Sequence, residues 1–426
     1  MKNANLYGFS TENDGLTNAK ILQELVNGGG EIAVETEGIY DISETVEIGD
    51  NTTLRFAKGV QIRRQPSSSD RNGMLLINKG IATHTYNENI KIIGLHIDCN
   101  NVESDDWGAD SLHVGLRAHV GMIYIKNLTV EDFECIGVQK CDYGIQISAF
   151  ENIHLENLYI TGDKDGIHLG WGKGFTIRNG KFCTFDDPIA LNAFDYATSN
   201  THVGWIEDGI VEDCYDLNAE ETTGFFCRLL GGAWCDWFEG MKVQHSDTVC
   251  SCGRVYRVIA RPDGEVYTSS TPPSHEFGVK TYNGIVWACV RDEGIYDCGC
   301  RNIVLRNIHL QKKRHSAIGL SLNYDVYARS YYPGCKLVAQ ENISFENIFI
   351  ENEVKYLIES NHPTKDIRIK NTDMKNSAVY FMTTKIDGMS YPEADITLEN
   401  VVTKPDSIIG DEGHPYHITV INEKGE

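Results

Sequence analysis

One short pattern recurs along the chain and limits the possible folds more than any other feature. In each copy an Asn is followed by alternating apolar residues, then by a second Asn or Gly, and then by further alternation. The inner Asn residues of neighbouring copies follow one another at similar intervals, as from Asn127 to Asn157 and from Asn157 to Asn179. The clear copies are residues 89–97, 152–160, 302–310 and 342–350, and the weaker copies are residues 122–130, 174–182, 366–374 and 395–402.

The interval falls in the range of ~20–50 residues that is typical of repeat architectures, and the alternation inside it indicates short stacked strands rather than helices. Each copy contains two strands joined at a single Asn, a residue that tolerates the left-handed backbone of such a bend. One coil cannot bury its apolar face alone, so neighbouring coils must stack and bring the Asn side chains into a ladder. The leucine-rich consensus and the regular hairpins of a propeller are missing. The sequence therefore predicts an all-β, right-handed parallel β-helix.

The domain organisation follows from where this rhythm starts and stops. We expect a single β-helix domain over 1–426, in which 1–50 form the N-terminal cap and the first strands. Thr17–Gly28 has the pattern of an amphipathic helix that ends at glycines, and it would cover the open end of the solenoid. Residues of about 214–300 break the rhythm, and we expect inserted loops or extra strands there. This segment contains Trp234, Trp237 and Trp287.

The net charge of the chain limits the classes of molecule that it can bind. With 38 Lys and Arg against 61 Asp and Glu, the formal net charge is −23, which disfavours nucleic acid and anionic membrane surfaces as partners. The sequence has no apolar run near the ~20 residues that span a bilayer. Its start lacks the apolar core of a signal peptide, so we expect a cytoplasmic protein, or a secreted one if a leader has been removed. The oligomeric state is left open.

The cysteines indicate a reducing environment. There are 13 of them, and the closest groupings, Cys250-Ser-Cys252 and Cys298-Gly-Cys300, are too short for a zinc knuckle. We expect structural thiols that pack as small apolar residues, with no metal and no cofactor.

In the middle of the chain, three stretches of alternating apolar residues are each preceded by an aspartate. Asp142, Asp165 and Asp187 follow one another at intervals of one coil, and Asp186 stands beside the last of them. Equivalent positions on adjacent coils lie about 4.8 Å apart. Carboxylates at that spacing repel one another and raise one another's pKa, which destabilises the fold. Acid–base catalysis, however, requires a carboxyl that is protonated near neutral pH beside an ionised one. Turn-ending aspartates without chemistry are the alternative.

These residues carry a resemblance to a known family. The segments Lys164–Leu169 (Lys-Asp-Gly-Ile-His-Leu) and Phe185–Asn192 (Phe-Asp-Asp-Pro-Ile-Ala-Leu-Asn) resemble glycoside hydrolase family 28, the polygalacturonase-like hydrolases with a pectin lyase-like β-helix. The resemblance implies an inverting hydrolysis in which Asp186 is the general acid, while Asp165 and Asp187 activate water. The chain departs from the family pattern at Lys164, at Pro188, and in lacking the Gly-His-Gly and Arg-Ile-Lys motifs.

Five further residues are candidates for substrate binding. Arg228 lies among apolar residues and would either bind substrate or hold the aspartates. His168 alternates with core residues and is expected to point toward the groove beside Asp165. Trp234 could stack on a sugar ring, although packing is the usual role of a Trp. Lys280, like Arg228, could take the place of a cation of the missing basic motif. His315 ends the run Lys-Lys-Arg-His, which is either a solvated turn or a basic wall of the cleft.

The function expected from these features is a cofactor-free glycoside hydrolase whose partner is an oligo- or polysaccharide of pectin type or a related kind. Two alternatives use the same fold. One is a polysaccharide lyase in which the aspartates hold Ca²⁺ and Arg228 or a Lys is the base. The other is a non-catalytic, tailspike-like carbohydrate-binding β-helix. The sugar, the linkage and exo or endo action are not fixed by the sequence.

Overall fold

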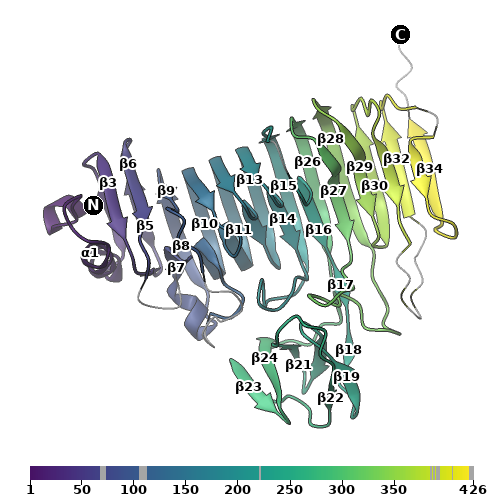
Figure 1. Ribbon diagram of the computed structural model, residues 1–426, viewed down its shortest axis with the longest axis horizontal. Coiled ribbons are helices and arrows are strands. Elements are labelled where there is room, and N and C mark those ends of the chain that lie inside the picture. The colour runs from purple at the N-terminus through teal and green to yellow at the C-terminus, as the bar shows by residue number, and fades with distance from the viewer. Residues whose placement is uncertain are drawn as a thin grey trace.

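The chain folds into a long solenoid whose coils run from the N-terminal to the C-terminal end of the molecule (Figure 1). The computed structural model describes residues 1–67, 73–104, 113–219, 222–383, 386, 389, 394–404 and 406–421. Twenty-five strands form one continuous sheet, and nearly every neighbouring pair is parallel and one coil apart in sequence. The predicted right-handed parallel β-helix is confirmed.

Two stacks of strands make up most of the solenoid wall. Along most of these strands buried residues alternate with more exposed ones, although some short strands are buried throughout, and the inward-facing apolar residues form one continuous core. The first stack consists of β10 (Ala118–Val138), β11 (Tyr143–Gly162), β13 (Gly172–Thr184), β15 (Ile206–Asp216), β26 (Cys300–Leu310), β28 (Gln340–Ile350), β30 (Thr364–Lys370), β32 (Ala394–Glu399) and β34 (Tyr416–Ile421). The second consists of β12 (Ile167–Leu169), β14 (Ile189–Asn192), β16 (Cys227–Leu230), β27 (Arg314–Ser321), β29 (Val354–Ser360), β31 (Ala378–Phe381) and β33 (Ile408–Gly410).

The N-terminal end is closed by the predicted helix. Helix α1 (Gly15–Asn27) begins at Asp14, whose side chain accepts a hydrogen bond from the Thr17 amide, and it buries Leu22 and Val26 against the first coils. No described helix is both long enough and apolar enough to cross a membrane. The remaining elements at this end are β1 (Lys2–Asn3), η1 (Ala4–Tyr7), β2 (Gly30–Val34), β3 (Gly38–Ile42), β4 (Val46–Ile48), β5 (Thr52–Phe56), β6 (Val60–Arg64), β7 (Leu76–Asn78), η2 (Lys79–Thr83), β8 (Asn87–Ile93) and β9 (His96–Asp98).

Asn side chains form two ladders at the bends of the coils, where the sequence predicts one. The two bends of each coil carry residues with positive φ, and their side chains bond from coil to coil. The register also corrects the pairing, because Asn127 lies beside Asn152, whereas Asn157 lies beside Asp132. The interval from Asn127 to Asn157 therefore joins members of different ladders. The other rungs are Asn51–Asn89, Asn89–Asn127, Asn157–Asn179, Asp208–Asn302, Asp213–Asn307, Asn302–Asn342, Asn307–Asn347 and Asn371–Asn400.

The segment that breaks the rhythm is an insertion of extra strands between β16 and β26. It forms a small lobe beside the solenoid, built around a five-stranded sheet that is mostly antiparallel (Figure 1). The insertion begins later than about 214, because β15 and β16 still belong to the coils. Its strands are β17 (Gly232–Ala233), β18 (Cys235–Asp236), β19 (Met241–Val243), β20 (Thr248–Ser251), β21 (Arg254–Val258), β22 (Tyr267–Ser269), β23 (Val279–Tyr282), β24 (Ile285–Arg291) and β25 (Asp297–Cys298).

Candidate functional site

Three carboxylates meet where β12 and β14 begin. Ile167 pairs with Ile189 across these strands, so Asp165 and Asp187 occupy the same position on adjacent coils. Asp165, Asp186 and Asp187 each place one carboxylate oxygen within 4.8 Å of the others. Asp165 and Asp187 are only 2% and 1% exposed, whereas the side chain of Asp186 is 23% exposed. Asp186 is thus the member of this carboxylate cluster that reaches solvent.

Asp142 does not join the cluster, which corrects the sequence prediction. Ile145 pairs with Ile167, so the residue at the position of Asp165 on the preceding coil is Tyr143. Asp142 therefore stands one position too early in the chain, and such a shift turns a side chain to the other face of the sheet. Asp142 is instead buried near Ser104, whose amide donates to its two carboxylate oxygens at 3.2 and 3.1 Å.

Two cations neutralise the cluster. The Lys164 ammonium forms an ion pair with Asp186. Arg228 lies on β16, with its Nε 3.1 Å from Asp187 Oδ2 and 3.2 Å from the side-chain oxygen of Asn192. Because Arg228 is about one-fifth exposed, it both holds Asp187 and presents some surface to the exterior. These are the two roles that the sequence leaves open for Arg228.

His168 points toward Asp165, as expected, but it is buried rather than exposed to a groove. Its Nδ1 lies 2.9 Å from Asp165 Oδ2, and its Nε2 lies 3.3 Å from Asp195 Oδ2. The ring stacks on Tyr143 at a centroid distance of 4.4 Å and has no exposed surface. His168 therefore orients Asp165 and has no surface with which to contact substrate.

The two buried carboxyls have opposite pKa shifts. Burial raises the pKa of Asp187 to about 7, and the charges of Asp186 and Asp165 add to that rise although Arg228 opposes it. Burial also acts to raise the pKa of Asp165, but Lys164, His168 and Arg228 outweigh it and hold the pKa below its ordinary value. At neutral pH the cluster therefore contains an ionised carboxylate, Asp165, beside a carboxyl, Asp187, that is protonated in part of the molecules.

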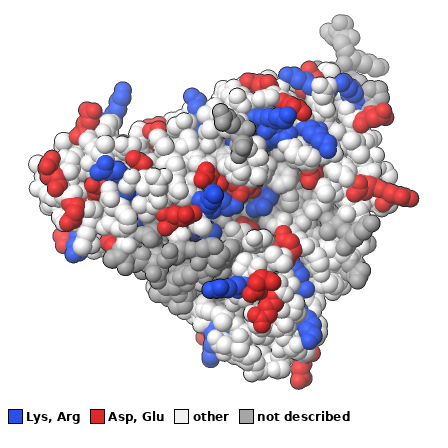
Figure 2. Space-filling model, viewed as in Figure 1, with Lys and Arg blue, Asp and Glu red and all other residues white. Residues whose placement is uncertain are grey.

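The cluster opens on a cavity of about 530 Å³ next to Asp186. Phe185 and Thr223 also line a second cavity, of about 580 Å³, so the two adjoin. Acidic and basic side chains interleave on the face drawn in Figure 2, despite the strongly negative net charge. The first cavity is lined by Lys140, Asp163, Lys164, Phe185, Asp186 and Thr223, and the second by Phe185, Thr222, Thr223, Lys313, Arg314, His315, Glu353 and Lys355.

The remaining candidates divide between the cavities and other parts of the molecule. His315 is exposed and lines the second cavity, as expected for a cleft wall. Trp234 is only 2% exposed and packs against Phe194, so it offers no face to a sugar. Lys280 lies on β23, on the far side of the small lobe from β14 and β16 (Figure 1), where its ammonium sits over the Tyr282 ring. The structure thus removes Trp234 and Lys280 from the site.

Two residues of the site are missed by sequence reasoning. Asp195 follows β14 and connects His168 with Arg228, whose Nη2 lies 3.9 Å away. It is outside the strands, so no periodic signal marks it. Asp163 lines the first cavity beside Lys164. Its position shortly before Asp165 is visible in the sequence, but only the fold shows that it is exposed at the cavity.

Comparisons with known proteins define the fold and leave the family open. No family model and no curated protein sequence matches the chain. Among solved structures, the bacteriophage phi29 gene product 12 N-terminal fragment is similar over 99% of this chain and 66% of that chain, at 13% identity and a TM-score of 0.50. The pre-mature form of gene product 12 has 13% identity and a TM-score of 0.46, over 98% of this chain and 51% of that chain. The chain thus spans between half and two thirds of the length of these two gene product 12 chains.

A Yersinia enterocolitica family 28 exopolygalacturonase is also similar, with 12% identity and a TM-score of 0.44 over 99% of this chain and 78% of that chain. The likeness to the gene product 12 N-terminal fragment, at a TM-score of 0.50 and 13% identity, shows the fold alone.

Proposed function

We propose that the chain is a carbohydrate-active enzyme, a glycoside hydrolase that cleaves O-glycosidic bonds of an oligo- or polysaccharide without a cofactor. The observation that carries the proposal is the carboxylate cluster itself. Asp165, Asp186 and Asp187 lie together, Asp186 lines a cavity, and the environments of the two buried members shift their pKa values in opposite directions. Pairs of carboxyls with separated pKa values are the basis of acid–base catalysis in glycosidases.

The exposures suggest a division of roles. Asp186 lines the cavity at the position to which the family 28 resemblance gives the general acid, but its ion pair with Lys164 requires the carboxylate form. Asp187, with its pKa near 7, lies in the same cluster and is the carboxyl from which Asp186 would take the proton that it passes to a leaving-group oxygen. Asp165 remains ionised and completes the charge balance with Lys164 and Arg228.

The stereochemical course needs its own measurement. The resemblance implies inversion, in which the two catalytic carboxyls are about 6.5–9.5 Å apart to admit a water. The cluster is tighter, because its nearest oxygens lie within 4.8 Å. An inverting reaction would therefore need a base outside the cluster, and Asp163 at the same cavity is the carboxylate available for it. Nuclear magnetic resonance of the first-formed anomer distinguishes inversion from retention.

The substrate class can be approached through the second cavity. Its exposed lining carries Lys313, Lys355 and His315 beside Glu353, and Lys313 is paired with that glutamate at 2.6 Å. Lys355 is the cation that this pairing leaves at the lining, and it favours a sugar that carries a carboxylate. Uronic acid oligosaccharides and their neutral counterparts should accordingly be tested side by side.

The decisive experiment measures the release of reducing ends from defined oligosaccharides by the protein and by two Asp-to-Asn variants. Asp186→Asn should lower turnover by about 10²–10⁴-fold, the range that a general acid contributes. Asp213→Asn is the matched control, because Asp213 stands in a bend ladder whose next two rungs, Asn307 and Asn347, carry Asn. Equal loss of activity in the two variants would refute the assignment.

The same assay separates the alternatives. A Ca²⁺-dependent lyase would lose activity on chelation and would release products with an absorbing double bond, and a hydrolase would do neither. Binding of labelled oligosaccharides without cleavage would instead support a carbohydrate-binding role. The pairing of Lys164 and Arg228 with the carboxylates favours the hydrolase, since the cationic positions beside the cluster are already filled.

A further inference from the structure

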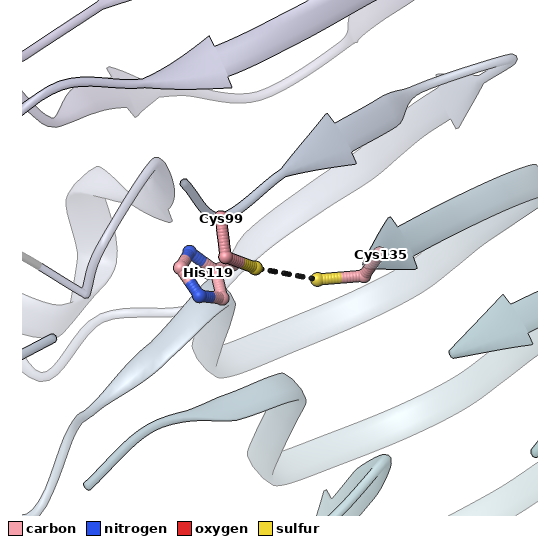
Figure 3. Close-up of side chains that lie close together, drawn as sticks. All are labelled: Cys99, His119 and Cys135. Atoms are coloured by element: carbon pink, nitrogen blue, oxygen red, sulfur yellow. Dashed lines mark hydrogen bonds between the residues drawn. The ribbon is translucent and has the colours of Figure 1, made fainter. Parts of the chain in front are cut away.

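A second cluster of reactive side chains lies inside the solenoid, away from the carboxylate cluster. Cys99 directly follows β9, while His119 and Cys135 come from the two ends of β10, which bends around the coil between them. The three side chains converge in the interior, with the His119 ring beside the Cys99 sulfur (Figure 3). One donor atom from each residue lies within 4.8 Å of the other two.

Burial makes this thiol–imidazole cluster unusual. Cys99, His119 and Cys135 have no exposed surface, and the two cysteines belong to the continuous apolar core. Neither ring nitrogen of His119 makes a hydrogen bond of ordinary geometry to any described residue. An imidazole removed from water without such partners carries the cost of its lost hydrogen bonds. Apolar side chains dominate the interior of the coils. A bound ligand that contacts a ring nitrogen of His119 and the two sulfurs would compensate for these missing hydrogen bonds.

The donor atoms and their spacing match a metal ion. The two sulfurs are 3.6 Å apart, close to the ~3.8 Å between two sulfurs that each lie about 2.3 Å from one tetrahedral Zn²⁺.

We propose that Cys99, His119 and Cys135 bind one thiophilic metal ion inside the β-helix. Two thiolates and an imidazole are soft donors that select Cu⁺ or Zn²⁺ over hard cations such as Ca²⁺ and Mg²⁺. Structural Zn²⁺ takes four ligands, whereas the described residues supply three, and a trigonal set of soft donors suits Cu⁺. The ion would join β9 to both ends of β10 and so fasten two adjacent coils. Binding releases the thiol protons and is coupled to folding, because the site is closed to solvent.

The test measures metal content, independently of any catalytic activity. The full chain is produced in medium supplemented with Cu⁺ or with Zn²⁺, purified anaerobically under reducing conditions, and analysed by mass spectrometry of the elements. We expect one ion per chain, lost in Cys99→Ala and in Cys135→Ala. Cys214→Ala is the matched control, because Cys214 is equally buried in the same core and its thiol donates to a backbone carbonyl, that of Glu212, at 3.2 Å. It should retain the full metal content.

A second measurement covers variants that fail to fold. X-ray absorption at the metal edge of the unaltered protein should show two sulfur ligands and one nitrogen ligand. The proposal is overturned if neither metal exceeds trace content, if the Cys99→Ala and Cys135→Ala variants fold and keep their metal, or if peptide mapping finds Cys99 and Cys135 joined as a disulfide in the reduced preparation.

Discussion

At the scale of single residues, the elevated pKa of Asp187 makes stability depend on pH. An unfolded Asp loses its proton near ~3.9, whereas folded Asp187 keeps it up to about 7. Between these values the folded state binds more protons than the unfolded state, so the free energy of unfolding should fall as pH rises and level off above about 7. Chemical denaturation across this pH range measures the slope. Asp187→Asn should remove it, and an unchanged slope in that variant would assign the effect to another group.

A second prediction at this scale concerns His168, which lies between Asp165 and Asp195. His168→Leu would remove the hydrogen bond between the His168 ring and Asp165 and a contact of Asp195, and a buried polar group left without its partner costs about 1–3 kcal/mol. His154→Leu is the control, because His154 forms its 2.8 Å pair with Glu156 on a partly exposed face, where such a pair contributes about 0–1 kcal/mol. Thermal unfolding of both variants should show the difference, and equal losses would mean that His168 acts only by filling space.

The residue scale also shows where prediction from sequence stops. The interval between Asp165 and Asp187 correctly predicts that they stack, because one strand follows the other at the same position. The interval from Asp142 to Asp165 is nearly the same and suggests the same stacking. It is one residue longer than the coil, however, so the Asp142 side chain lies on the opposite face of the sheet from Asp165. The proposed metal ligands Cys99, His119 and Cys135 escape prediction altogether, since only the closing of a coil brings both ends of β10 together.

At the scale of elements, the contribution of the coil bends to the free energy of unfolding can be measured. Asn152 has φ 59° and bonds the side chain of Asn127, while the next coil has Gly174 at the same rung. Asn152→Ala should lose about 1–2 kcal/mol through its left-handed backbone and a further ~1 kcal/mol through the lost hydrogen bond. Asn152→Gly keeps the backbone conformation and should lose mainly the hydrogen bond. Denaturant midpoints of both variants test this, and equal midpoints would show that backbone conformation contributes nothing.

The repeated elements explain why the fold is predictable. Alternation over successive coils leaves one arrangement that buries every apolar face, and the bend residues mark its corners, so fold class follows from pattern alone. The pairing of rungs does not, because two ladders built from the same residue type give two interleaved sets of intervals. Asn127 and Asn157 belong to different ladders for this reason.

At the scale of the whole molecule, the inserted lobe is tied to the candidate active site by Arg257 of β21. Arg257 is fully buried and donates to the carbonyls of Asn200 and Thr201 at 2.8 and 3.1 Å, and also to that of Asp195. Asp195 in turn contacts His168 and so supports Asp165. The sequence shows this insertion only as a break in rhythm, and no residue pattern connects it with the carboxylates of another coil.

Arg257→Leu should therefore loosen the loop that holds Asp195 without unfolding the coils. Hydrogen exchange followed by mass spectrometry should show faster exchange in residues 193–203 and an unchanged rate in the strands β26 and β28. Arg254→Leu is the control on the same strand, because Arg254 pairs with the exposed Glu276 at the surface of the lobe at 3.3 Å. If both variants speed exchange in the loop equally, the anchoring contact lies elsewhere in the lobe. If neither does, the loop is held by the solenoid alone, and the insertion is independent of the site.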